Sequence, residues 1–314
     1  MISVVIPVYN EEANLERLME RLEKSLAALS SPQDYEIILV DDGSRDRSLE
    51  ILQELGRSRP RVRVVEMVRN YGQHAAVFAG FEQARGEIIV TLDADLQNPP
   101  EEIPRLVRVM EEGDWEVVGT VREERQDSIL RRLPSRLINA VTRKMTKVNL
   151  SDWGCMLRAY RRPVVQAMLA CQEHSTFIPA LATIFAKRVT EIPVEHAERE
   201  AGQSHYNLWK LFRLQFDLVT SFSDYPLQFL LYLGLILAGL GIAFGVLLAA
   251  LRLYFGSGWA AEGVFTLFAI LFFLVGAQFF ALGLIGEYIG RIYREVRKRP
   301  RYLVRRVYGE EKRV

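Results

Sequence analysis

Residues 87–100 read Glu-Ile-Ile-Val-Thr-Leu-Asp-Ala-Asp-Leu-Gln-Asn-Pro-Pro, a short apolar run followed by acidic and amide side chains and then by two prolines. The run 87–92 is typical of a buried strand, and the prolines suit the first turn of a helix over 100–112. A strand that leads through a polar loop into a helix is the repeating unit of a parallel sheet. This stretch therefore predicts an α/β fold.

The same alternation extends on both sides of this stretch. Further strands are predicted where β-branched residues cluster, at 2–6, 35–40, 62–68 and 115–119. Helices are predicted after Asn10, taken as a cap, after Asp46, and over 75–84. Strands and helices are expected to resume over 154–160, 177–186 and 189–196. We therefore expect a Rossmann-like, mostly parallel sheet flanked by helices, in a domain that occupies residues 1–200.

Charged residues are distributed unevenly along the rest of the chain. The stretches 227–251 and 263–286 contain no charged side chain. Each is long enough, at about 1.5 Å per residue, to cross a hydrocarbon core about 30 Å thick. We therefore expect two transmembrane helices within 227–290. The arginine-rich segment 291–314 is predicted to be a cytoplasmic tail, and two crossings would return it to the side of the first domain.

Two amphipathic stretches lie before the predicted spans. Residues 127–149 interleave apolar side chains with arginines and lysines, which indicates either a solvated helix face or a segment that contacts anionic lipid. Residues 201–226 suggest a helix that lies in the membrane interface. The N-terminus has no pattern typical of a signal peptide, so the first domain is expected in the cytoplasm.

Several functional classes are excluded by missing patterns. Cys155 and Cys171 lack the spacings of zinc sites and redox motifs, and a disulfide framework is not expected. No Gly-x-Gly-x-x-Gly follows the first strand and no P-loop pattern occurs, which argues against nicotinamide enzymes and P-loop nucleotide enzymes. No nucleic-acid partner is expected.

The acidic residues after the run 87–92 predict a cation site. If the strand continues briefly, Asp93, Asp95 and Gln97 project to one side because side chains alternate along a strand. Carboxylates held this close repel one another unless a hard divalent cation neutralises them. Ligands of α/β sheets bind at the carboxyl ends of the strands, where these residues stand. We therefore expect Mg²⁺ or Mn²⁺ here, bridging the oxygens of a diphosphate.

Two other predicted strand ends carry polar residues that would face the same crevice. The first strand leads into residues 7–11, Pro-Val-Tyr-Asn-Glu, and the second into residues 41–44, Asp-Asp-Gly-Ser. Carboxylates at these positions suit hydrogen bonds to the base and ribose of a nucleotide. The alternative is that Asp41 and Asp42 are turn and cap residues.

Four motifs occur in the order seen in one enzyme family: 3–11 Ser-Val-Val-Ile-Pro-Val-Tyr-Asn-Glu, 40–44 Val-Asp-Asp-Gly-Ser, 93–97 Asp-Ala-Asp-Leu-Gln and 154–158 Gly-Cys-Met-Leu-Arg. With these motifs the chain resembles the inverting family 2 glycosyltransferases, in particular the polyprenyl-phosphate branch. The resemblance implies a GT-A type domain and runs almost from end to end. It implies transfer of a sugar from a UDP-sugar to a polyprenyl phosphate at the cytoplasmic face of the bacterial inner membrane.

A second set of stretches is similar to members of this branch that transfer 4-deoxy-4-formamido-L-arabinose to undecaprenyl phosphate for lipid A modification, which underlies polymyxin resistance. These stretches are 69–74, 119–128, 175–179, 259–263 and 286–293. They are the sole ground for choosing this sugar over glucose or another hexose. A non-enzymatic alternative is a membrane scaffold or a flippase subunit, against which the three acidic clusters argue.

The resemblance also implies roles for single residues. Those assigned to the uridine nucleotide are Pro7, Tyr9, Glu11, Asp41, Asp42 and Asp93. Those assigned to the metal are Asp93, Asp95 and Gln97. Asp95 is thereby also one of the two residues assigned to catalysis.

On the acceptor side, the resemblance implies that four residues contact phosphate groups of the donor or the lipid: Arg122, Arg136, Arg199 and Ser204. His205 departs from the lysine common in relatives. Asp152 matches an acidic residue on the acceptor side of the active site and is the second residue assigned to catalysis, with a turn role as its alternative. The membrane lipids are further partners, and glycines at 234, 239, 241 and 245 suit helix packing in a homo-oligomer.

Overall fold

The computed structural model describes residues 1–29, 34–122, 155–171, 177–194, 225–255, 264–297 and 299–309. The chain divides into two compact units. The first contains a sheet with its helices and includes the C-terminal segment from Arg299 onward. The second contains two long helices that precede this segment.

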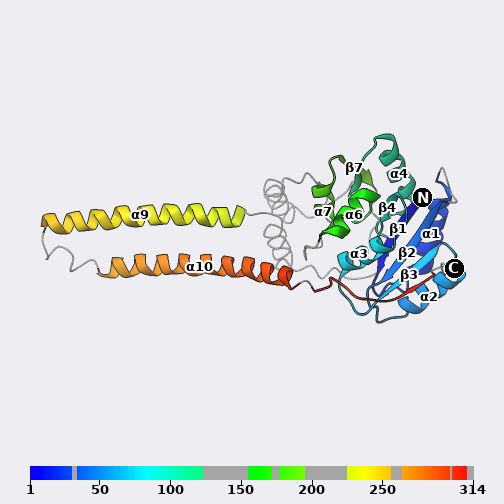
Figure 1. The fold of residues 1–314 in the computed structure, drawn as a ribbon, viewed down its shortest axis with the longest axis horizontal. Helices are drawn as coiled ribbons and strands as arrows, with labels where there is room; N and C mark the ends of the chain where they lie inside the picture. The colour runs from blue at the N-terminus through cyan, green and yellow to red at the C-terminus, as the bar shows by residue number, and fades with distance from the viewer. Residues whose placement is uncertain are drawn as a thin grey trace. The chain divides into compact units, whose positions relative to one another are not determined.

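An eight-stranded sheet forms the centre of the first unit, with the strand order β7-β5-β6-β4-β1-β2-β3-β8 (Figure 1). The strands are β1 (Ile2–Val8), β2 (Tyr35–Asp41), β3 (Val62–Met67), β4 (Ile88–Thr91), β5 (Val117–Arg122), β6 (Arg158–Arg161), β7 (Val189–Val194) and β8 (Val304–Tyr308). β1 is parallel to β2 and β4, β2 to β3, and β5 to β7, whereas β6 and β8 run antiparallel to their neighbours. The strand order reverses beside β1, because β2 follows on one side and β4 on the other.

Helices cover both faces of this sheet (Figure 1). One face carries α1 (Leu15–Ala27), α2 (Ser48–Ser58), the 3-10 turn η1 (Pro100–Glu102) and α4 (Ile103–Glu112), and the other carries α3 (Gln73–Gln83), α6 (Arg162–Ala170) and α7 (Ile178–Phe185). Side chains of β1 alternate between the two layers. Val4 and Ile6 join the core beneath α1, while Val5 contacts Gly80 of α3. The expected α/β fold, with helices on both faces of a mostly parallel sheet, is confirmed.

Asn10 does not cap the first helix, so that prediction was wrong. The capping position is Asn14, and α1 begins at Leu15. Asn10 instead adopts a left-handed backbone with φ 56°, and its Oδ1 accepts the N–H of Arg45 at 2.7 Å. The loop after β1 is therefore held by the loop after β2, which brings two strand ends together.

The C-terminal segment is part of the sheet. Residues 291–314 were expected to be a basic tail, but residues 304–308 form β8 and pair with β3. Glu66 of β3 accepts hydrogen bonds from Arg305 Nη1 at 3.0 Å and from the Tyr308 hydroxyl at 2.7 Å. Arg305 of this segment therefore has a partner within the domain.

The second unit contains α9 (Tyr225–Phe255) and α10 (Val264–Val296), which contact one another. Within them, Leu227–Phe255 and Phe273–Gly290 are long and apolar enough to cross a membrane, by length and composition. Their side chains are not buried inside the protein. The expected interfacial helix over 201–226 overlaps α9 only at its last two positions, and the rest of it lies outside the described residues, as does the basic stretch 127–149.

Candidate active site

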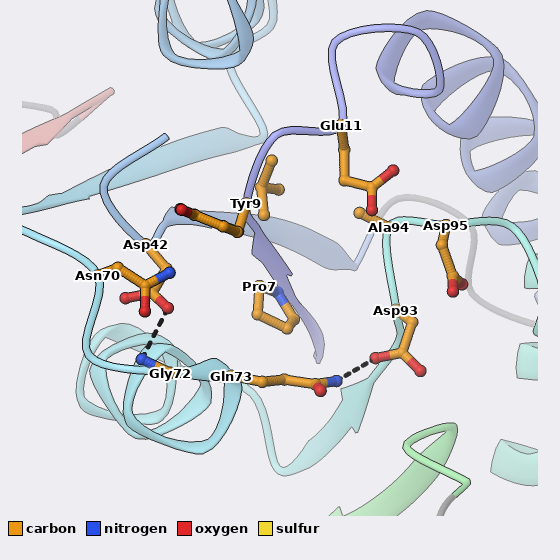
Figure 2. Close-up of a pocket in the computed structure, with 11 residues that line it drawn as sticks. Pro7, Tyr9, Glu11, Asp42, Asn70, Gly72, Gln73, Asp93, Ala94 and Asp95 are labelled. Atoms are coloured by element: carbon orange, nitrogen blue, oxygen red, sulfur yellow. Dashed lines mark hydrogen bonds between the residues drawn. The ribbon is translucent and has the colours of Figure 1, made fainter. Parts of the chain in front are cut away.

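A pocket of about 280 Å³ opens at the carboxyl ends of β1, β2, β3 and β4 (Figure 2). Its walls are formed by Pro7, Val8, Tyr9, Glu11, Asp42, Asn70, Gly72, Gln73, Asp93, Ala94 and Asp95. It lies where the strand order reverses, between β1 and β4. This is the place where open α/β sheets bind their ligands, because the loops diverge there.

The end of β1 contributes an aromatic ring and a carboxylate to the pocket. The Tyr9 side chain is 39% exposed and lies at the pocket wall near Asp42 (Figure 2). Glu11 is held by its neighbours, since its carboxylate accepts Asn14 Nδ2 at 2.6 Å and its backbone N–H donates to Ser48 Oγ at 2.9 Å. The starts of α1 and α2 therefore orient the acidic residue that follows β1.

The two aspartates at the end of β2, Asp41 in the strand and Asp42 after it, have different surroundings. The Asp41 carboxylate accepts the backbone N–H groups of Gly43 and Ser44, both at 3.2 Å, as a turn residue does, and it does not line the pocket. The Asp42 carboxylate lines the pocket and accepts the N–H groups of Tyr71 at 2.7 Å and Gly72 at 2.8 Å. Burial raises the pKa of both carboxyls. The nucleotide interpretation therefore suits Asp42, and the turn interpretation suits Asp41.

The turn after Asp42 requires glycine. Gly43 has φ +69°, and a Cβ at this position would lie 2.6 Å from the Arg69 carbonyl carbon. The loop after β2 thus packs backbone to backbone against the loop after β3, which contributes Asn70 to the pocket, and α3 follows with Gln73 at its first position.

Asp93 and Asp95 both line the pocket, but a turn rather than a continuing strand brings them together. β4 ends at Thr91, and Leu96 has φ 60°. The expectation that residues 93, 95 and 97 alternate along a strand was therefore wrong. Gln97 is not among the described residues that line the pocket, and its backbone N–H donates to Asp95 Oδ1 at 3.2 Å.

The Asp93 carboxylate is held by two side-chain amides. Gln73 Nε2 donates to Asp93 Oδ1 (Figure 2). Asn98 Nδ2 donates to Asp93 Oδ2 at 3.2 Å. The carboxylate is thereby fixed from α3 on one side and from the loop before η1 on the other.

The chemistry of these residues fits a hard divalent cation. Asp93 and Asp95 supply carboxylate oxygens to one pocket. Within the described parts of the chain, no group of three or more His, Cys, Asp or Glu side chains forms a metal site. Mg²⁺ is commonly held by one or two carboxylates and keeps its other positions for substrate phosphates and water. Two carboxylates at an open pocket match that pattern.

The sequence analysis missed the contribution of the loop after β3. Asn70, Gly72 and Gln73 line the pocket, and Gly72 also donates its N–H to Asp42. These residues had been noted only as a stretch of family similarity, because residues 69–74 contain no acidic side chain. The rule that ligands bind at strand ends, applied to β3 as it was to β1 and β2, would have found them.

The side chains predicted for the acceptor side of the site are not described by the structure. Asp152, Arg136, Arg199 and Ser204 lie outside the described residues. Arg122 ends β5, where it pairs with Val194 of β7, and its side chain is not described. The roles predicted for these five residues remain proposals.

Comparison with known proteins identifies the family. The family model described as glycosyl transferase family 2 matches residues 3–169. An undecaprenyl-phosphate 4-deoxy-4-formamido-L-arabinose transferase of Edwardsiella ictaluri is 57% identical over 309 residues, which cover 98% of this chain and 94% of that protein. A protein of the same name from Proteus mirabilis is 56% identical over 312 residues, which cover 99% of this chain and 95% of that protein.

The fold has relatives among solved structures. Glucosyl-3-phosphoglycerate synthase from Mycobacterium tuberculosis, in complex with Mn²⁺, uridine diphosphate and phosphoglyceric acid, has a TM-score of 0.52 at 20% identity. The match covers 70% of this chain and 76% of that one. At this identity the likeness concerns the fold. Because the family model covers more than half of the chain and close relatives cover nearly all of it, this chain belongs to glycosyl transferase family 2 and is a glycosyltransferase.

Proposed function

We propose that this enzyme transfers 4-deoxy-4-formamido-L-arabinose from a UDP-sugar to undecaprenyl phosphate at the cytoplasmic face of the inner membrane. The observation that carries the proposal is the identity of 57% to a transferase of that name over 98% of the chain. The similarity therefore includes the sheet unit and also the two apolar helices. A scaffold or flippase role does not account for a pocket that gathers Glu11, Asp42, Asp93 and Asp95.

The donor half of the proposal rests on the pocket. Asp42 and Glu11 offer carboxylate oxygens to the N–H and hydroxyl groups of a nucleoside, and Tyr9 offers an aromatic face. Asp93 and Asp95 would hold Mg²⁺ or Mn²⁺. The bound cation would supply charge neutralisation for the diphosphate leaving group. Holding the donor in one orientation for in-line attack is then the task of the pocket walls.

The acceptor half rests on the chemistry of the phosphate monoester. Its second pKa is about 6, so it is largely dianionic at neutral pH and attacks without a strong base. Asp152 would then orient the acceptor or take a residual proton, and Arg122, Arg136, Arg199 and Ser204 would contact phosphate groups. Attack opposite to the leaving diphosphate inverts the anomeric carbon.

The proposed location at the membrane rests on the two apolar helices. A polyprenyl phosphate presents its charged group only at the membrane surface. α9 and α10 would anchor the enzyme there, and the basic stretch 127–149 would attract the lipid phosphate. Self-association through α9 belongs to the same proposal, because small residues allow close helix packing in lipid.

One assay tests the function. Purified full-length enzyme in nanodiscs is incubated with undecaprenyl phosphate and a panel of UDP-sugars that includes the formamido-arabinose and glucose donors, with and without EDTA. We expect transfer of the formamido sugar, loss of transfer with EDTA, and recovery with Mg²⁺ or Mn²⁺. Asp93→Ala should lower the rate by about 10²–10³-fold, as removal of an electrostatic stabiliser commonly does.

The matched control is Asp114→Ala, because Asp114 is an exposed carboxylate outside the pocket that pairs with Arg188. This variant should keep the wild-type rate. Transfer that withstands both EDTA and Asp93→Ala would refute the metal assignment, and preference for the glucose donor would favour the hexosyltransferase alternative.

A further inference from the structure

We propose that Asn98 is a positioning residue that holds Asp93 in place for the cation and the diphosphate, and that the Cys155 thiol holds the other end of the Asn98 amide. The inference deepens the proposed function and rests on it. It assigns a role to two buried residues that do not line the pocket themselves.

The orientation of the Asn98 amide follows from its two contacts. The side chain is 3% exposed, its Nδ2 donates to Asp93 Oδ2 at 3.2 Å, and its Oδ1 accepts from Cys155 Sγ at 3.3 Å. A carboxylate accepts hydrogen bonds and cannot donate them, so the NH₂ end of the amide must face Asp93. The oxygen end then faces the thiol, which is the group that can donate to it.

The thiol is held in place from β5. Cys155 is 2% exposed, and its Sγ lies 2.8 Å from Thr120 Oγ1. The thiol has one proton, which it donates to Asn98, so a hydrogen bond between Thr120 and Cys155 must use the proton of the Thr120 hydroxyl. The same hydroxyl also lies 2.8 Å from the Leu157 carbonyl, its alternative acceptor. A continuous series of buried contacts thus runs from β5 through Cys155 and Asn98 to Asp93.

The kind of group that holds Asp93 matters for a cation site. Asn98 and Gln73 are neutral amides, one on each oxygen of the Asp93 carboxylate. A neutral donor fixes the direction of a carboxylate without placing a positive charge beside it. Such outer partners commonly change metal affinity by about 10–100-fold when they are removed. Asn98 should therefore affect binding of the cation more than folding.

The test measures cation binding directly. Full-length enzyme in detergent is titrated with Mn²⁺ in the presence of UDP, and free Mn²⁺ is followed by electron paramagnetic resonance. No sugar transfer is involved. We expect Asn98→Ala to weaken Mn²⁺ binding by about 10–100-fold. Cys155→Ala should weaken it less, and Cys155→Ser should stay close to wild type because serine retains a hydrogen-bond donor.

The matched control is Ser25→Ala. The Ser25 hydroxyl is buried and donates to the Pro100 carbonyl at 2.6 Å, so the substitution removes a buried hydrogen bond at the end of the loop that carries Asn98, without touching Asp93. We expect Ser25→Ala to lower the midpoint of thermal unfolding without weakening Mn²⁺ binding. Asn98→Ala should weaken Mn²⁺ binding even where the two midpoints are equal.

The outcomes separate this inference from the proposed function. If wild-type enzyme with UDP fails to bind Mn²⁺, the donor site of the proposed function is refuted, and this inference with it. If wild type binds Mn²⁺ and Asn98→Ala binds it equally well, only the positioning role is overturned. Should Asn98→Ala fail to fold, the Cys155 pair decides: equal Mn²⁺ affinity of the alanine and serine variants would refute the role of the thiol in holding the Asn98 amide against Asp93.

Discussion

At the scale of single residues, the pocket is built from side chains that neighbouring loops hold by their backbone. Asp42 accepts two N–H groups from the loop after β3, and Gly43 allows the two loops to approach. His74 follows the pocket residue Gln73 in the sequence, and its imidazole ring is neutral. Its ring packs edge-on against Phe177 at 5.2 Å, and its Nδ1 is buried without a hydrogen-bond partner among the described residues.

Burial lowers the pKa of His74 to about 4. In the unfolded chain a histidine has a pKa of about 6.5, so between these values the unfolded state binds more protons than the folded state. The free energy of unfolding therefore rises with pH across this window, and the effect is complete above about pH 6.5.

Replacing His74 by glutamine should flatten this dependence. We expect wild type to lose more stability than His74→Gln when the pH falls from 7 to 5, by at most about 1.4 kcal/mol per pH unit. The measurement is urea unfolding of both proteins in detergent, followed by tryptophan fluorescence at several pH values. Parallel pH profiles for the two proteins would contradict a His74 that is kept neutral by burial of its Nδ1 atom.

At the scale of elements, β8 follows the two apolar helices in the sequence and supports a strand that ends at the pocket. It pairs with β3, and the Leu303 carbonyl before it accepts the N–H of Val68 at 2.9 Å. Asn70, two residues further along, lines the pocket. β8 therefore supports the strand whose end carries part of the donor site, and it covers an edge of the sheet that would otherwise be open.

Removing β8 should weaken the donor site. We expect a chain that ends at Arg299 to have a lower midpoint of thermal unfolding and weaker UDP binding than one that ends at Gly309, which retains β8. Calorimetry with UDP in detergent measures the affinity. Equal UDP affinity of the two chains would contradict the support that β8 gives to the loop after β3.

Tyr308→Phe is the milder test of β8. It removes the hydrogen bonds of the Tyr308 hydroxyl to Glu66 and from Gln53, at 2.7 and 3.0 Å. The expected loss in the free energy of unfolding is about 1–3 kcal/mol, since each hydrogen bond commonly contributes about 0.5–1.5 kcal/mol.

At the scale of the whole molecule, the sheet limits the membrane topology. β8 follows α9 and α10 in the sequence and pairs with β3, which precedes them. Residues 304–308 and 62–67 must therefore lie on the same side of any membrane, so the chain crosses it an even number of times. The positive-inside rule leads to the same arrangement from the arginines after α10.

Cysteine labelling tests this topology. In a Cys171→Ser background, Arg57→Cys on the exposed surface of α2 should react with an impermeant maleimide in inverted vesicles alone. Ser257→Cys, between the two predicted spans, should react in right-side-out vesicles alone. Labelling of both positions from the same side would contradict two crossings.

The sequence by itself determined most of the segments that form strands and helices, with β8 as an exception, where the acidic residues stand, and that two stretches are apolar enough for a membrane. Each of these properties is local, because alternation and apolar runs record the burial of a segment whatever its partner is. The placement of Asp93 and Asp95 at the end of β4 was therefore predictable, although the turn that joins them was not.

Only the tertiary structure decided which distant segments meet. Pairing of β8 with β3, the entry of Asn70 and Gln73 into the pocket, and the contact of Asn98 with Cys155 depend on strand order. Strand order is set by how all the segments share one core, and no single stretch of sequence carries that information.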